Sequence, residues 1–301
     1  MTRHAGRMKR VVPLTLVFCV AVVAACSSAK PAAVQTTSSA APTSAASSTG
    51  PVVRPTHTVV VLMENHSYSD VIGNADAPYI NSLAGAGATF TQSFAVTHPS
   101  QPNYLALFSG STQGVTDDSC PQTFTAPDLG SELRAAGKTF AGYSESLPAP
   151  GSTDCTSGSY ARKHAPWTDF SALPASVNLP FTAFPSDYAT LPTVAFVVPN
   201  LDNDMHDGTV AQGDQWLQHN LAGYITWAKA HNSILVLTWD EDDRSADNQI
   251  PTIIVGEHIK PGKYDEHLTH YGVLRTLEDL YGLPPIGESA KAAPVTDIWQ
   301  N

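Results

Sequence analysis

Residues 233–243 read SILVLTWDEDD, an uninterrupted apolar run that ends in four consecutive acidic residues. Short apolar runs rich in β-branched residues are typical of strands that are buried on both faces of a parallel sheet. Similar runs occur at 57–64 (HTVVVLME), 138–145 (KTFAGYSE), 193–200 (TVAFVVPN) and 251–257 (PTIIVGE). We therefore predict five buried strands in one mostly parallel sheet.

Segments with helical periodicity alternate with these strands. They cover residues 77–87, 126–138, 212–232 and 269–283. Alternating strands and helices predict an α/β fold, a three-layer sandwich with a mostly parallel central sheet. Ligands of such folds bind beyond the carboxyl ends of the strands, so the residues directly after each strand are the first candidates for function.

Acidic and amide side chains follow three of the predicted strands. Glu64 and Asn65 follow the first, Asp240 and Glu241 follow the run quoted above, and the segment 201–208 (LDNDMHDG) follows a third. Carboxylates crowded at one edge repel each other unless a cation or a bound proton offsets their charge. Oxygen ligands favour Mg²⁺, Ca²⁺ or Mn²⁺, and a histidine would also admit Zn²⁺ or Fe. The pattern predicts a divalent metal and leaves its identity and number open; the alternative for each acidic run alone is a solvated turn.

The stretch 97–107 (THPSQPNYLAL) begins another helical pattern, in which Pro102 suits the first turn. Ser100 therefore lies at a helix N-terminus, where backbone N–H groups attract phosphate. A serine hydroxyl becomes a nucleophile when a metal or a base lowers its pKa. We predict that Ser100 caps the helix and is the nucleophile of phosphoryl transfer. No G-x-S-x-G motif surrounds it, which disfavours an α/β-hydrolase.

The first 55 residues are not expected to belong to the folded domain. Residues 1–25 combine a basic head with an apolar run too short for a membrane span, and V-A-A-C resembles a lipobox ending at Cys26. We predict a lipoprotein signal peptide (1–25), lipidation of Cys26, and a disordered tether rich in Ser, Thr, Ala and Pro (26–55). The catalytic domain would span 56–301 and be exported, anchored at the outer face of the cell membrane or in the cell envelope, with partial secretion left open.

Charge and cysteine usage agree with export. Residues 1–25 hold four of the 16 Lys and Arg residues and none of the 27 acidic residues, so the rest of the chain has a formal net charge of −15. Such a chain is a poor binder of nucleic acid. Cys120 and Cys155 are expected to form a disulfide in an exported protein.

Five stretches, in the same order along the chain, carry a family resemblance: MENHSYSD, THPSQPNYLALFSG, PNLDNDMHDG, LTWDEDD and HLTHYGVLRTLEDLYGL. They resemble the bacterial phosphoesterase family, which joins acid phosphatases and phospholipases C within the alkaline-phosphatase superfamily. The resemblance covers about 57–299 and implies an alkaline-phosphatase-like fold.

The resemblance also implies residue roles. The implied metal ligands are Glu64, Asn65, Ser100, Asp240 and Glu241. The implied substrate-binding residues are Asn103, His98 and Asp207. Ser100 matches the nucleophile, and His206 or His270 would protonate the leaving alcohol. The remaining histidines that we considered are expected to be structural, namely His57, His164, His219, His231 and His258, and the roles of Asp202 and Asp204 stay open.

The sequence thus predicts a metal-dependent acid phosphatase that hydrolyses a phosphomonoester through a phosphoserine. A phosphoinositide, a sugar phosphate or a nucleotide would each fit as substrate. A phosphodiesterase of the phospholipase C type is the second hypothesis, although the phospholipases C resemble E-N-R-S-F-D where this chain has ENHSYSD at 64–70. A non-catalytic, cation-binding envelope lipoprotein is the third.

Overall fold

The computed structural model describes residues 53–300. The predicted signal peptide, the lipidated Cys26 and nearly all of the predicted tether lie outside this range and stay predictions. Within the described range, none of the helices combines the length and the apolar character that a membrane crossing requires.

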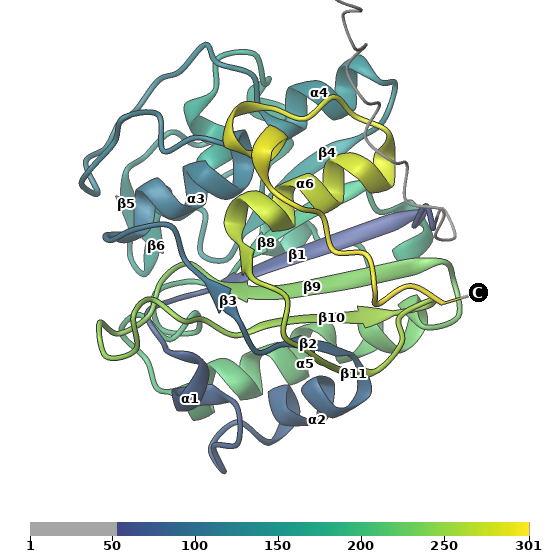
Figure 1. Ribbon diagram of the computed structural model, residues 1–301. Helices are drawn as coiled ribbons and strands as arrows, with labels where there is room; N and C mark the ends of the chain where they lie inside the picture. Colours follow the sequence, from purple (N-terminus) through teal and green to yellow (C-terminus); the bar gives the residue numbers. More distant parts are fainter. Residues whose placement is uncertain (1–52, 301) are drawn as a thin grey trace, which may run out of the picture. The chain divides into compact units, whose positions relative to one another are not determined.

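An eight-stranded sheet forms the middle layer of the fold (Figure 1). Its strands, from one edge to the other, are β11 (Gly262–Tyr264), β2 (Ala88–Phe90), β10 (Thr252–Gly256), β9 (Ser233–Trp239), β1 (His57–Met63), β8 (Val194–Val198), β4 (Phe140–Ser144) and β7 (Asn178–Pro180). Two small sheets pair β3 (Ser93–Phe94) with β12 (Leu268–Thr269), and β5 (Thr156–Ser157) with β6 (Tyr160–Ala161).

The prediction of a mostly parallel sheet is confirmed, with one difference in direction. Five successive strands, β9, β1, β8, β4 and the edge strand β7, are parallel neighbours, whereas β10 runs antiparallel to both β9 and β2. All five predicted strands are present. The three that the sequence did not reveal, β2, β7 and β11, are only three residues long.

Helices cover both faces of the sheet (Figure 1). They are α1 (Tyr68–Val71), α2 (Pro78–Ala86), α3 (Ser100–Ser109), α4 (Leu129–Ala135), α5 (Val210–Ala228) and α6 (His270–Tyr281). Short 3-10 helices complete the chain, namely η1 (Arg162–His164), η2 (Pro166–Asp169), η3 (Ala175–Val177), η4 (Phe181–Ala183), η5 (Tyr188–Thr190) and η6 (Gly287–Lys291). One core cluster joins the sheet to α3, α4 and α6, and a second joins it to α2 and α5, so the three-layer sandwich is confirmed.

Alternating side chains of β1 supply both cores. Val60 and Leu62 belong to the cluster under α3, α4 and α6, whereas Val59, Val61 and Met63 belong to the cluster under α2 and α5. Side chains of a strand alternate between the two faces of a sheet, so a strand covered on both faces must be apolar at every position. The uninterrupted runs in the sequence are therefore the signature of the middle layer.

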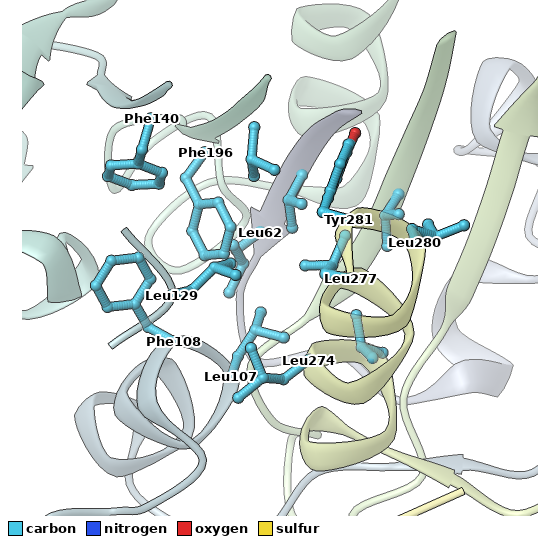
Figure 2. Packing of buried hydrophobic residues seen from close by; sticks show 14 of the residues in the cluster. Leu62, Leu107, Phe108, Leu129, Phe140, Phe196, Leu274, Leu277, Leu280 and Tyr281 are labelled. Atoms are coloured by element: carbon cyan, nitrogen blue, oxygen red, sulfur yellow. The ribbon is translucent and has the colours of Figure 1, made fainter. Parts of the chain in front are cut away.

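Aromatic packing fixes α3 on the sheet. Figure 2 shows Phe108 of α3 beside Phe140 of β4 and Phe196 of β8, and the ring centroids of Phe108 lie 5.3 Å and 5.5 Å from theirs. Leu274 and Leu277 of α6 belong to the same cluster. Full burial of one such side chain contributes about 1.5–3 kcal/mol. This packing sets the position of the other end of α3, where Ser100 lies.

The predicted disulfide is present. Cys120 and Cys155 are bonded with a Cα–Cα distance of 5.8 Å across a sequence separation of 35 residues. A crosslink of that span stabilises the folded state by about 3–4 kcal/mol in the chain-entropy account. It joins two irregular segments, one after α3 and one between β4 and β6.

A buried carboxyl on α6 makes the stability of the fold depend on pH. Glu278 is 1% exposed and accepts hydrogen bonds from the backbone N–H of Ile286 (3.0 Å) and the hydroxyl of Ser289 (2.7 Å). Burial raises the pKa of Glu278 from 4.5 to about 7. Between these two pH values the folded protein holds a proton that the unfolded chain has lost, so the free energy of unfolding falls as the pH rises through this window.

We expect the Glu278→Gln variant to lose this part of the pH dependence, which amounts to at most about 1.4 kcal/mol per pH unit. Urea unfolding of wild type and variant at several pH values between 4.5 and 7.5 measures the difference between their slopes. The exposed Glu288, changed to Gln, is the matched control and should keep the wild-type slope. Identical slopes for Glu278→Gln and wild type would contradict the prediction.

Candidate active site

The register of the central strands brings the predicted acidic residues together. Met63 of β1 is the partner of Trp239 of β9, so Glu64 and Asp240 leave neighbouring parallel strands side by side. The backbone N–H of Asn65 donates to Asp240 Oδ1 at 3.0 Å. Asn65 has a φ of 54°, a left-handed conformation that turns the chain immediately after the strand. The expectation that the strand ends share one edge is therefore confirmed.

Asp204 joins the same edge from the loop after β8. The backbone N–H of Glu64 donates to the Asp204 carbonyl at 2.8 Å, and the Asp204 side chain is fully buried. Its carboxylate accepts the backbone N–H of His206 at 2.8 Å. The sequence left the role of Asp204 open, and the structure places it in the acidic cluster.

Ser100 contacts the cluster from the start of α3. It is the first residue of α3, and Pro99 occupies the N-cap position without a side-chain capping bond. The prediction that Ser100 caps the helix is therefore wrong. Its hydroxyl instead donates to Glu64 Oε2 at 3.0 Å, and the side chain is 2% exposed. The hydroxyl of Tyr104, one turn later on α3, donates to Glu64 Oε1.

The helix N-terminus offers fewer donors to an anion than the sequence suggested. The backbone N–H of Gln101 donates to Asp118 Oδ1 at 2.9 Å, and Pro102 has no N–H. Asp118 is in turn paired with Lys163, whose Nζ lies 2.9 Å from Asp118 Oδ2. Charge on a bound phosphate would therefore have to be offset mainly by side chains.

His164 is the functional candidate that sequence reasoning missed. Its Nε2 lies 3.1 Å from Glu64 Oε1, and its Nδ1 lies 3.3 Å from Asp204 Oδ2. The ring stacks on Tyr104 with a centroid distance of 5.0 Å. His164 arrives on the 3-10 helix η1, so no strand end pointed to it, and the expectation that it is merely structural does not fit this position.

Burial and mutual repulsion perturb the acidic cluster. Burial, followed by the charges of Asp240 and Asp204, raises the pKa of Glu64 well above its usual value. Burial raises the pKa of Asp240 to about 6. Burial, followed by the charge of Asp240, raises the pKa of Glu241 to about 8, and burial raises the pKa of Asp204 well above its usual value. Four carboxyls at one strand edge are therefore strained as anions in the absence of a compensating positive charge.

The residues of this cluster fit a divalent cation. Glu64, His164 and Asp204 each offer a ligand atom, and the three atoms lie within 4.8 Å of one another. Asp240 Oδ2, Asp204 Oδ2 and His164 Nε2 are buried and make no well-aligned hydrogen bond, although the last two lie close to His164 Nδ1 and Glu64 Oε1, respectively. Unpaired buried oxygens and imidazole nitrogens are what a metal ion satisfies. The cluster is thus a candidate metal centre, formed by Glu64, His164, Asp204 and the neighbouring Asp240.

Glu241 points toward the residues predicted to bind substrate. His98 Nδ1 lies 3.0 Å from Glu241 Oε2, and Asn103 Nδ2 donates to the same oxygen at 3.4 Å. Asn103 also supports the turn before α3, because its Oδ1 accepts the backbone N–H groups of Val96 and Thr97 at 3.0 Å each. His98 is 21% exposed and so remains accessible from solvent.

The two histidines considered as general acids differ in position. His206 is partly exposed, its Nδ1 lies 2.7 Å from Asp207 Oδ1, and its ring centroid lies 5.9 Å from that of His164. His270 is 1% exposed, and its Nε2 is 2.9 Å from the carbonyl of Trp239. Burial lowers the pKa of His270 to about 4. His206 therefore suits proton donation to a substrate, whereas His270 is placed to support the end of β9.

Known proteins resemble this chain in sequence. The model of the phosphoesterase family matches residues 74–284. A phosphatidylinositol-3-phosphatase of Mycobacterium tuberculosis is 57% identical over 246 residues, which cover 81% of this chain and 82% of that protein. An acid phosphatase of Aspergillus fumigatus is 31% identical over 265 residues, which cover 80% of this chain and 58% of the fungal protein.

Solved structures share the fold of this chain. A Vibrio parahaemolyticus protein of the alkaline phosphatase superfamily has a TM-score of 0.58 at 14% identity, covering 80% of this chain and 71% of that one. Identity at this level establishes the shared fold alone. Together with the relatives above, it confirms the expected resemblance and leaves the hypothesis of a non-catalytic lipoprotein without support. The chain belongs to the phosphoesterase family and is a phosphoric ester hydrolase.

Proposed function

We propose that this protein is a divalent-metal-dependent acid phosphatase that removes the phosphate of a phosphomonoester, with a phosphoinositide as the favoured substrate class. The observation that carries the proposal is the hydroxyl of Ser100, 3.0 Å from Glu64 Oε2 at the edge of a buried acidic cluster. The relative from Mycobacterium tuberculosis is named for a phosphoinositide monoester, which supports the substrate class.

Ser100 would act as the nucleophile. Its oxygen forms a bond to phosphorus while the bond between phosphorus and the leaving oxygen breaks, and the hydroxyl proton passes to Glu64, its hydrogen-bond acceptor. His206 donates a proton to the leaving oxygen. Water then gives a proton to His206 and attacks phosphorus, the bond between phosphorus and the Ser100 oxygen breaks, and Glu64 returns the proton to that oxygen, which releases inorganic phosphate and restores all three side chains.

The metal would be held by two groups of residues. The family resemblance implies Glu64, Asn65, Ser100, Asp240 and Glu241, and the structure adds His164 and Asp204. A bound divalent ion would stabilise negative charge on the phosphate and on the serine oxygen. Asn103 and His98 lie beside Glu241 and would bind the equatorial phosphate oxygens. His206 and Asp207 would line the exposed side of the site.

The proposed location of the enzyme rests on the sequence alone. We keep the proposal that the signal peptide 1–25 exports the chain and that lipidated Cys26 holds the domain at the outer face of the membrane through the tether 26–55. A membrane anchor would suit a lipid substrate. The protein would then meet its substrate in a membrane, without nucleic acid as a partner.

The purified full-length protein, supplied with a divalent metal, should hydrolyse 4-nitrophenyl phosphate at least about a hundredfold faster than bis(4-nitrophenyl) phosphate. In a diester, the second alcohol group stays attached to phosphorus and would have to lie among the buried carboxylates of the acidic cluster, which should slow its reaction. Initial rates of nitrophenol release measure both reactions. A faster reaction with the diester would favour the phospholipase C-type hypothesis instead.

A further inference from the structure

A polar cavity lies beside the acidic cluster. Its volume is about 270 Å³, and it is lined by His98, Asp242, Arg244, Asp247 and Asn248. The proposed reaction uses His98 alone among these residues. The cavity lies between the turn that precedes α3 and the loop that follows β9, because Asn248 Nδ2 donates to the carbonyl of Thr97 at 2.8 Å.

His98 connects this cavity to the proposed reaction centre. Its Nδ1 lies 3.0 Å from Glu241 Oε2, and its Nε2 lies 3.2 Å from Asp242 Oδ1. Glu241 is the neighbour of Asp240 and lies within 3.4 Å of the Asn103 amide nitrogen. A substrate whose phosphate reached Asn103 would therefore have its alcohol part within reach of the cavity.

The loop 242–248 is held in a defined conformation. The carboxylate of Asp242 accepts three backbone N–H groups of its own loop, from Arg244 (2.8 Å), Ala246 (2.8 Å) and Asn248 (3.0 Å). Arg244 has a φ of 70°, a conformation that costs free energy for a residue with a side chain and is common at binding sites. The buried Asp242 thereby fixes the point from which Arg244 extends.

Arg244 adds an unpaired positive charge to the cavity. Within residues 53–300 it is engaged in no salt bridge, and its side chain is exposed. The titratable groups that line the cavity with Arg244 are His98, the buried Asp242 and the exposed Asp247.

We propose that this cavity is a subsite for the leaving group, in which Arg244 binds a second anionic group carried by the alcohol part of the substrate. The inference rests on the proposed phosphatase function and narrows its substrate class to phosphomonoesters whose alcohol bears a phosphate or a phosphodiester. A guanidinium group binds phosphate oxygens in a bidentate manner, which suits this role better than a lysine would. Both a phosphoinositide lipid and a soluble inositol phosphate meet this description.

Three substrates test the subsite with the full-length protein: inositol 3-phosphate, inositol 1,3-bisphosphate and soluble dibutanoyl phosphatidylinositol 3-phosphate. The last two differ from the first by a second anion, and the comparison between them separates a soluble substrate from a lipid headgroup. Wild type should have a higher kcat/KM for both than for inositol 3-phosphate. Arg244→Ala should reduce this preference about tenfold, mainly through KM, since a charge-assisted contact is lost.

Three further variants extend the experiment. Asp247→Asn removes a negative charge from the same cavity and should shift the preference in the opposite direction, toward the doubly anionic substrates. Arg134→Ala removes an exposed arginine of α4, outside the cavity, and should keep the wild-type preference. Arg244→Lys should recover part of the lost preference.

The outcomes separate the two proposals. The subsite would be overturned if Arg244→Ala lowered kcat/KM by the same factor for all three substrates. It would also be overturned if wild type did not prefer the two doubly anionic substrates to inositol 3-phosphate. Failure of wild type on 4-nitrophenyl phosphate would overturn the proposed phosphatase. In that case, calorimetry still tests whether Arg244 binds the second anion. The Ser100→Ala/Arg244→Ala variant should bind inositol 1,3-bisphosphate more weakly than Ser100→Ala does, and equal affinities would overturn the subsite.

Discussion

Replacement of Ser100 by alanine should lower kcat on 4-nitrophenyl phosphate by at least about a thousandfold, because it removes the oxygen that attacks phosphorus. The fold should remain. The variant loses the hydrogen bond from Ser100 to Glu64 and opens little space, which costs on the order of 1 kcal/mol. Steady-state rates and the free energy of unfolding, measured on the same preparations, test both parts of the prediction.

Ser109 provides the matched control at the other end of α3. Its hydroxyl donates to the carbonyl of Leu105 at 2.8 Å, away from the acidic cluster. Ser109→Ala should keep the wild-type rate with a comparable loss of stability. Acid-quenched wild type should carry a phosphoserine at residue 100, detectable by mass spectrometry of its peptides. A Ser100→Ala protein that retains more than about a tenth of the rate would show that another group attacks phosphorus.

The sequence predicted the acidic edge because parallel strands leave little freedom. Once the runs at 57–64 and 233–241 are recognised as neighbouring parallel strands, Glu64 and Asp240 must emerge at the same edge. The helices were predictable for a related reason, since each needs one apolar stripe to cover the sheet. What the sequence could not provide was register, and the direct contact of Asn65 N–H with Asp240 depends on it.

His164 and β10 differ in how far the sequence could have predicted them. His164 reaches Glu64 from the long segment between β4 and β8, which contains only short strands and 3-10 helices and is crosslinked by the disulfide. The sequence around His164 has no helical or strand periodicity from which the position of its side chain could be predicted. The direction of β10 could have been inferred, since the twelve residues 240–251 contain no helical pattern and a parallel crossover usually requires a helix.

Asp240→Asn should abolish the proposed metal-dependent activity and remove the stabilisation that the metal provides. Asp240 Oδ1 accepts the Asn65 N–H, whereas Oδ2 is buried without a partner. A ligand present at a hundredfold excess over its Kd stabilises the folded state by about 2.7 kcal/mol. The test removes bound metal with a chelator and then adds Mg²⁺, Ca²⁺, Mn²⁺ or Zn²⁺ to separate samples of wild type. The ion that binds should raise the denaturant concentration at which wild type unfolds.

The sign of the stability change distinguishes a metal ligand from an ordinary buried carboxylate. Without metal, Asp240→Asn removes one of four crowded negative charges, so the chelated variant should be at least as stable as chelated wild type. With metal, the order should reverse, because only wild type gains the binding energy. Asp243→Asn, the same change at an exposed position three residues along the chain, should leave both states and the activity as in wild type. If chelation altered neither the rate nor the unfolding of wild type, the four carboxyls would have to be stabilised by protons alone, and the proposed mechanism would need a different source of positive charge.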